Sequence, residues 1–117
     1  MTVRRELLDS GEIDLSDVTD GTHLPPIHPG QVLKHEYLEP LDMSVYALAH
    51  SLAVSRSRMN EIVQGHRAIT AETALRLGRF LGTSADFWLG LQAAYDLEVA
   101  KLSVGERVRS EVKPHAA

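Results

Sequence analysis

The 117-residue sequence contains no cysteine, which excludes disulfide bonds, iron–sulfur clusters and zinc sites with thiolate ligands. It has no stretch near the roughly 20 apolar residues that a membrane-spanning helix needs. Two arginines near the start are not followed by an apolar run, so the sequence does not predict a signal peptide. We therefore expect a soluble, cytoplasmic protein with one domain, large enough to bury a modest core.

The sequence also lacks the patterns typical of catalytic and metal sites. Its six histidines show no metal-binding spacing, and the segment KHEY around His35 does not match the zinc motif H-E-x-x-H. Tyr37 with its neighbours Glu36 and Glu39 could suggest acid–base chemistry, but acidic residues on the surface of a helix explain them better. There is no nucleophile–base pair and no glycine-rich phosphate loop. We therefore expect no enzyme activity, no metal and no cofactor.

Negative charge is concentrated at the N-terminus. The chain has 12 basic and 16 acidic residues, and residues 1–26 hold two arginines against six acidic residues. Residues 27–117 hold ten of each kind, yet within residues 54–79 five arginines accompany only two glutamates, a net charge of +3. An otherwise neutral domain thus gathers its positive charge on one segment.

Three parts are predicted along the chain. Residues 1–26 show no sustained helical or strand period and end within HLPPIHPG, whose three prolines forbid a continuous helix. We predict a flexible acidic N-terminal extension there. Residues 27–104 are predicted to form the domain, and residues 105–117 a C-terminal tail.

Five helices with short connections are predicted from Gly30 onward. The first places Leu33 and Tyr37 four residues apart and is expected to stop at Pro40. The last is expected to run to about Gly105. No segment alternates with period two over the length of a strand, so the fold is predicted to be all-α. Residues suited to cap the second to fifth helices precede them, at Ser44, Ser55, Thr70 and Ser84.

The second and third predicted helices are separated only by Ala53–Ser55. Two short helices joined by so short a turn form a helix-turn-helix, which places its second helix in the DNA major groove. At 100° per residue, Met59, Ile62 and Val63 of this second helix face the core. The opposite side carries polar residues with an arginine on either flank, namely Ser57, Asn60, Glu61 and Gln64 with Arg56 and Arg58.

Residues 28–100 resemble a known family in three pieces whose order and spacing are specific. These pieces are HPG before the first helix, RSRMNEIVQGHRAIT across the third helix, and FWLGLQAAYDLE in the last. Together they resemble the HigA family of bacterial antitoxins, also called VapI-type, within the Xre or lambda-repressor-like class. The resemblance implies a five-helix lambda-repressor-like helix-turn-helix domain.

The resemblance also implies a function and two partners. It implies a homodimer that binds a palindromic operator in the promoter of its own operon and represses transcription. It further implies a RelE/HigB-like toxin that cleaves mRNA on the ribosome and that the antitoxin neutralises. A stand-alone regulator on the same scaffold, without a toxin, is the alternative. A protein-interaction module that has lost DNA binding is a third possibility.

Individual DNA contacts can be predicted for the third helix. Arg56, at its start, suits the O6 and N7 atoms of guanine, and Asn60 suits the N6/N7 edge of adenine. Ser57 is short enough to reach only a base or phosphate directly beneath it. Arg58, Gln64 and Arg67 are expected at phosphates. The full set of predicted DNA-binding residues is Ser44, Ser55, Arg56, Ser57, Arg58, Asn60, Glu61, Gln64 and Arg67.

Two further roles remain open in the sequence. Residues of one stripe on the last helix, at about 84–104, are predicted to make a twofold dimer contact, with a purely core role as the alternative. The acidic extension is expected to be a solubilising tail, with toxin contact or shielding of the third helix as alternatives. The predicted dimer residues are Trp88, Leu91, Tyr95 and Val99.

Four residues depart from the family pattern. Asp42 and Ala53 stand where glycine is common, and we expect the turn at Ala53 to have adjusted so that this residue avoids a positive φ. His50 and His66 stand where lysines are common, so phosphate contacts there are expected to be weaker and sensitive to pH.

Overall fold

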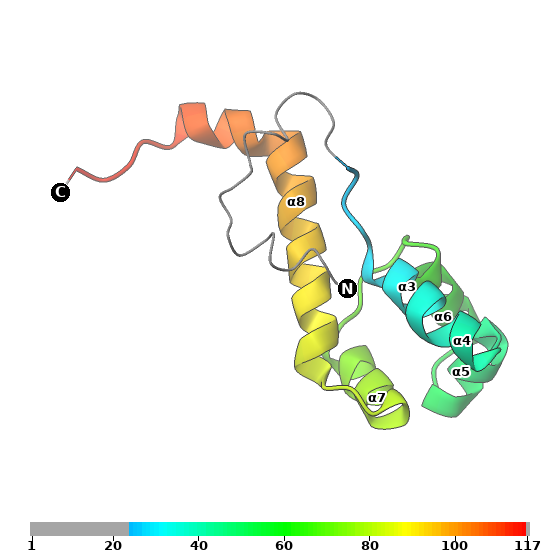
Figure 1. The fold of residues 1–117 in the computed structure, drawn as a ribbon. Coiled ribbons are helices and arrows are strands. Elements are labelled where there is room, and N and C mark those ends of the chain that lie inside the picture. Colours follow the sequence, from blue (N-terminus) through cyan, green and yellow to red (C-terminus); the bar gives the residue numbers. More distant parts are fainter. Residues whose placement is uncertain (1–23, 117) are drawn as a thin grey trace.

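The computed structural model describes residues 24–116, and their arrangement is shown in Figure 1. Most of the predicted acidic extension, residues 1–23, lies outside the described residues. Between residues 24 and 116 the secondary structure is entirely helical. The first helix is continuous and comprises α3 (Pro29–Val32), η1 (Leu33–Leu38) and α4 (Glu39–Leu41). It is followed by α5 (Val45–Leu52), α6 (Arg56–Val63), α7 (Ala71–Leu81) and α8 (Ala85–Glu111), which confirms the predicted all-α fold of five helices.

The segment His28-Pro29-Gly30 fixes the start of the first helix against α6. The Nδ1 atom of His28 accepts a hydrogen bond from the N–H of Gly30 at 2.8 Å, and Pro29 supplies the first helical residue. A Cβ atom on Gly30 would overlap the backbone oxygen of Ile62 and lie 2.8 Å from its carbonyl carbon. Gly30 therefore permits the close approach of α3 to the end of α6.

The prediction that the first helix stops at Pro40 is wrong. Pro40 has no N–H, and in a regular α-helix its ring would clash with the carbonyl group four residues earlier. The preceding segment η1 is instead a π-helix, in which the N–H of Glu39 bonds to the carbonyl oxygen of Lys34, five residues back. This wider turn accommodates the proline, and the helix ends at Leu41.

The core forms where the first helix, α5, α6, α7 and the start of α8 meet. Trp88 is its largest fully buried side chain. The indole N–H of Trp88 donates to the hydroxyl of Thr83 at 2.7 Å, so its polar atom is satisfied. The other fully or nearly fully buried apolar residues are Leu33, Leu38, Leu48, Ala49, Leu52, Met59, Ile62, Ile69, Ala74 and Leu77.

All four predicted helix caps are confirmed. The side-chain oxygens of Ser44, Ser55, Thr70 and Ser84 each accept a hydrogen bond from the backbone N–H three residues later, at 3.0–3.3 Å. Because such caps satisfy backbone donors that the helix itself leaves free, they determine where α5, α6, α7 and α8 begin.

The prediction that the turn at Ala53 avoids a positive φ is also wrong. Ala53 has φ 58° and ψ 44°, which is the left-handed region. Its N–H bonds to carbonyl oxygens at the end of α5, and this hydrogen bonding closes the helix. The tight connection to α6 requires this conformation, so alanine carries a strain there that glycine would not. Asp42 is likewise left-handed, with φ 55°.

Helix α8 is longer than the sequence predicts. It continues past Gly105 to Glu111, so most of the predicted tail at residues 105–117 is helical. Figure 1 shows that the helix changes direction in its orange section. The hydroxyl of Ser103 donates to the carbonyl oxygen of Val99 at 2.9 Å, a type of bond that bends helices. No helix within residues 24–116 is both long and apolar enough to cross a membrane.

Candidate nucleic-acid interface

The helix-turn-helix has the predicted geometry. Ala53–Ser55 alone connect α5 to α6, and the N-terminal ends of both helices carry an exposed serine cap, Ser44 and Ser55. On α6, Met59 and Ile62 are fully buried and Val63 is half-buried. The predicted core side of α6 is therefore confirmed. Its opposite side is accessible, with Ser57, Asn60 and Gln64 exposed and Glu61 half-buried.

The arginines of residues 54–79 divide into paired and unpaired ones. The Nε atom of Arg67 lies 2.7 Å from a carboxylate oxygen of Glu61. Arg76 pairs with Glu72 at 2.8 Å and also donates to the carbonyl oxygen of Leu52 at 3.0 Å. Three arginines of this segment form no ion pair with any residue between 24 and 116, namely Arg56, Arg58 and Arg79.

The two unpaired arginines of α6 differ in their surroundings. The guanidinium carbon of Arg56 lies 5.1 Å from the ring centre of Tyr46, on α5. Arg58 has no hydrogen bond or aromatic contact from its guanidinium group to residues 24–116. The guanidinium group of Arg56 therefore contacts an aromatic ring from α5, whereas that of Arg58 has no such contact within residues 24–116.

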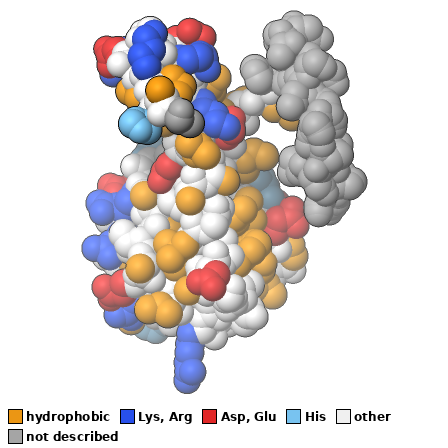
Figure 2. Space-filling model, turned by 90° about the vertical axis from the view of Figure 1, so that its left-hand side faces the viewer, with side chains coloured by type: hydrophobic (Ala, Val, Ile, Leu, Met, Phe, Trp, Pro, Cys, Tyr) orange, Lys and Arg blue, Asp and Glu red, His pale blue; other side chains and the backbone are white. Residues whose placement is uncertain are grey.

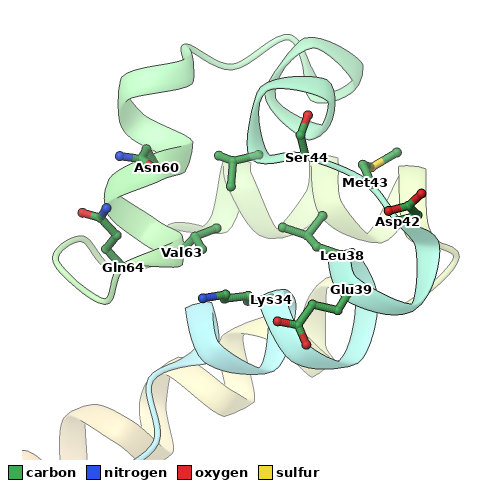
Figure 3. A pocket seen from close by; sticks show the side chains of 10 residues that line it. Lys34, Leu38, Glu39, Asp42, Met43, Ser44, Asn60, Val63 and Gln64 are labelled. Carbon is green, nitrogen blue, oxygen red and sulfur yellow. The ribbon is translucent and has the colours of Figure 1, made fainter.

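A groove runs between α6, the start of α5 and the first helix, as Figure 3 shows. Asn60 and Gln64 extend from α6 on one side of it, and Lys34 and Glu39 extend from the first helix on the other. Ser44 lies at the start of α5 above the groove. The groove thus brings predicted base and phosphate contacts together with a lysine from another helix.

Lys34 and Tyr46 were not predicted to belong to this site. Lys34 is the only lysine or arginine between residues 27 and 55, which was a usable signal for a positive charge on the first helix. Its proximity to α6 depends on the packing of the first helix and has no local sequence signature. Tyr46 follows the Ser44 cap by two residues and is 60% exposed. Hydrophobic periodicity leaves it off the core side of α5, but its contact with Arg56 depends on how α5 packs against α6 and has no local sequence signature.

The predicted dimer stripe on α8 becomes more exposed along the helix. Trp88 is 0% exposed and packs between Tyr37 and Phe87, with ring centres at 5.3 and 4.9 Å. The prediction that it contacts a second copy is therefore wrong, because it has no free surface. Leu91 and Tyr95 are half-buried, and Val99 is 38% exposed.

Helix α8 also has apolar residues on its other side. Leu97 is 57% exposed and lies about 200° around the helix from Val99. Val108, also exposed, lies within about 20° of Leu97 in a regular helix. Figure 2, which looks onto the side of the molecule that carries α8, shows hydrophobic side chains in several patches.

His28 connects the helix-turn-helix to α8. Its ring packs edge-on against that of Tyr95, with ring centres 4.8 Å apart, and a Cβ atom added to Gly65, after α6, would lie 3.7 Å from His28. Burial lowers the pKa of the His28 imidazole below its ordinary value, and the Asp96 carboxylate opposes this effect. The neutral ring also suits the geometry, because Nδ1 must lack a proton to accept from Gly30.

Comparison with known proteins agrees with this architecture. A family described as Helix-turn-helix matches residues 35–88. Virulence-associated protein I of Dichelobacter nodosus is 55% identical over 78 residues, which cover 67% of this chain and 72% of that protein.

Two solved structures resemble the fold closely. The Pseudomonas aeruginosa antitoxin HigA, solved with the higBA promoter, is 44% identical with a TM-score of 0.76, over 78% of this chain and 99% of that one. Antitoxin GraA in complex with its operator is 36% identical with a TM-score of 0.76, over 80% and 95% of the two chains. The chain therefore belongs to the HigA, or VapI-type, antitoxin family of helix-turn-helix DNA-binding regulators.

Proposed function

We propose that this protein is a sequence-specific repressor that binds a palindromic operator in its own promoter as a homodimer and neutralises a RelE/HigB-like toxin. One observation carries the DNA-binding part. The accessible side of α6 holds Arg56, Ser57 and Asn60 beside the capped start of α5, and Arg56 forms no ion pair with residues 24–116. Uncommitted donors at adjoining helix starts suit the base edges and phosphates of DNA.

The contacts divide into two kinds in this proposal. Arg56 contacts guanine, Asn60 contacts adenine, and Ser55 and Ser57 lie close to the bases at the start of α6. Arg58, Gln64 and Ser44 contact phosphates. The ion pair between Glu61 and Arg67 reduces the positive charge that Arg67 can offer, so its phosphate contact is the weakest of the set.

A comparison of two arginine variants tests the division. Arg56→Ala should weaken binding to the cognate operator by about 1–3 kcal/mol per contact and relax the preference at one base pair of each half-site. Arg58→Ala should weaken cognate and random DNA alike and reduce the salt dependence by about one unit per contact. Binding should be measured over a salt series with both DNAs. Equal losses on both DNAs for Arg56→Ala would show that another residue recognises the base.

The exposed part of the stripe on α8 supports the proposed homodimer. Beyond Tyr95, the stripe on α8 is exposed at Val99 and Leu102, by 38% and 63%, and a twofold contact through Val99 would bury it. Such a contact would place two copies of α6 on one face of DNA, and half-sites one helical turn apart require a spacing of about 34 Å. A palindromic operator matches this symmetry.

The toxin partner is supported by the antitoxin names of the relatives and not by a surface identified within residues 24–116. The deciding observation is a short, basic, RelE-like reading frame next to this gene, whose growth inhibition is relieved when this protein is produced with it. If no such frame exists and no toxin is co-purified, the protein is a stand-alone regulator of the same scaffold, and the DNA-binding proposal is unaffected.

A further inference from the structure

The core does not account for Tyr46. It is the second residue of α5, and 60% of its surface is exposed. Its phenol forms no hydrogen bond with residues 24–116, and the only partner described for its ring is the guanidinium group of Arg56, at 5.1 Å. Removing the ring would therefore leave the hydrophobic core intact.

The contact between Tyr46 and Arg56 limits the motion of a flexible side chain. An unrestrained arginine loses rotamer entropy when it is fixed, and a guanidinium held against an aromatic face has lost part of this freedom before binding. The N–H groups of Arg56 remain without partners among the described residues, so they stay available for a base. Arg58, on the other flank of α6, has no such anchor.

The location of the pair matches this role. Tyr46 lies one residue beyond Val45, and Val45, Arg56, Ser57 and Asn60 together line a shallow depression between the starts of α5 and α6. The Tyr46 ring thus contacts Arg56 from α5, next to the depression in which we expect a base to lie.

We propose that Tyr46 is a positioning residue that holds Arg56 in the direction needed for base recognition. This proposal rests on the proposed operator binding. It makes the specificity of α6 depend on a residue of α5 that does not itself contact a base edge.

The test uses three variants of the full-length protein, with the duplex of its own promoter and a random duplex of equal length. Tyr46→Leu removes the aromatic face and should weaken promoter binding by about two- to fivefold per half-site, and so about 4- to 25-fold for the dimer. Preference at the base pair that Arg56 contacts should relax, while the salt dependence stays unchanged because no charge is lost. Tyr46→Phe keeps the ring and should bind like the wild type.

A double variant separates positioning from direct contact. In the Arg56→Ala background, Tyr46→Leu should cause no additional loss, because the arginine that the ring positions is gone. An undiminished loss in that background would overturn the proposal, as would a loss in Tyr46→Phe equal to that in Tyr46→Leu, which would indicate a hydroxyl–phosphate contact. Tighter promoter binding by Tyr46→Leu would also overturn it, because the ring would then be holding the arginine back.

A measurement without DNA keeps the two proposals distinguishable. In the free protein, the Arg56 δ-protons should show an upfield ring-current shift that Tyr46→Phe retains and Tyr46→Leu abolishes, with an unchanged melting temperature. If the wild type shows no such shift, Tyr46 does not position Arg56. If the shift is present but the wild type does not bind its promoter, the proposed function fails and the positioning proposal fails with it.

Discussion

Helix α6 and the second half of α8 both lie at the surface, but the apolar residues of α6 are buried or half-buried whereas several of those on α8 are exposed. On α6, Met59 and Ile62 are fully buried and the accessible side is polar. On α8, Val99 and Leu102 are 38% and 63% exposed, and Leu97 faces away from them. The apolar side of α6 is thus packed within the protein, and the accessible side of α6 carries only groups suited to a polar, charged partner. The chain leaves α8 with apolar surface that a second protein surface would bury.

The largest effect is expected on dimerisation, from a substitution among the exposed apolar residues of α8. Val99→Glu should raise the dimer dissociation constant about 1,000-fold, because the proposed twofold contact would bury the new charge of both copies at a total cost of about 4 kcal/mol. Light scattering and sedimentation at micromolar concentration measure this. Leu97→Glu is the matched control on the opposite side of the same helix and should remain dimeric. The reverse outcome would move the dimer contact to the side of Leu97.

The second prediction concerns the close packing behind α6. Gly30→Ala should lower the free energy of unfolding by about 3 kcal/mol, because its Cβ would overlap the backbone of Ile62, which is not free to move aside. Chemical denaturation measures the change. Gly90→Ala is the control, since its added Cβ would meet no atom within 4 Å apart from the neighbouring backbone of its own helix, and it should stabilise α8 slightly. A stable Gly30→Ala protein would mean that α6 is held less tightly than its burial indicates.

The third prediction concerns the turn that leads into α6. Ala53→Gly should raise the free energy of unfolding by about 1 kcal/mol, because glycine relieves the strain of φ 58° at a smaller cost in chain entropy. Thermal unfolding measures this. Asp42→Gly should gain less, because aspartate tolerates the left-handed region better than alanine does. Equal gains at both positions would contradict the assignment of strain to Ala53.

The smallest effect is expected at His28, which links the two regions. Its folded-state pKa is lowered, so the folded protein binds fewer protons than the unfolded chain. Its contribution to stability is therefore complete above the ordinary pKa of 6.5 and is lost as the pH falls through the folded-state value. His28→Asn keeps a cap acceptor and should remove this part of the acid sensitivity. Unfolding measured over a pH series compares the two proteins, and identical profiles would exclude His28 as the source.

Local sequence signals predicted the helix starts and the buried side of α6 well. A cap such as Ser55 bonds to the N–H three residues later, so its whole geometry lies within one turn of the sequence. Helix ends were predicted less well. The extension of α8 past Gly105 and the continuation of the first helix through Pro40 both override residue propensities.

The site was predicted in part. Spacing alone placed Arg56, Ser57 and Asn60 on the accessible side of α6, because a helix fixes which residues share a side. Spacing could not reveal the contact of Arg56 with Tyr46 or the presence of Lys34 in the groove, since both depend on how α6 packs against other helices. Spacing also could not show that Trp88 is fully buried in the core and has no surface left for a dimer contact.

The π-helical turn in the first helix changes the direction in which the residues after it point around the helix axis. A turn closed five residues apart contains one more residue than an α-helical turn, and one residue corresponds to about 100° around the axis. Everything beyond the turn is therefore rotated relative to a regular helix, including the direction in which the chain leaves Leu41 for α5. Pro40, for which no DNA contact is proposed, thus helps to set the orientation of Ser44 and the start of α5 relative to the first helix.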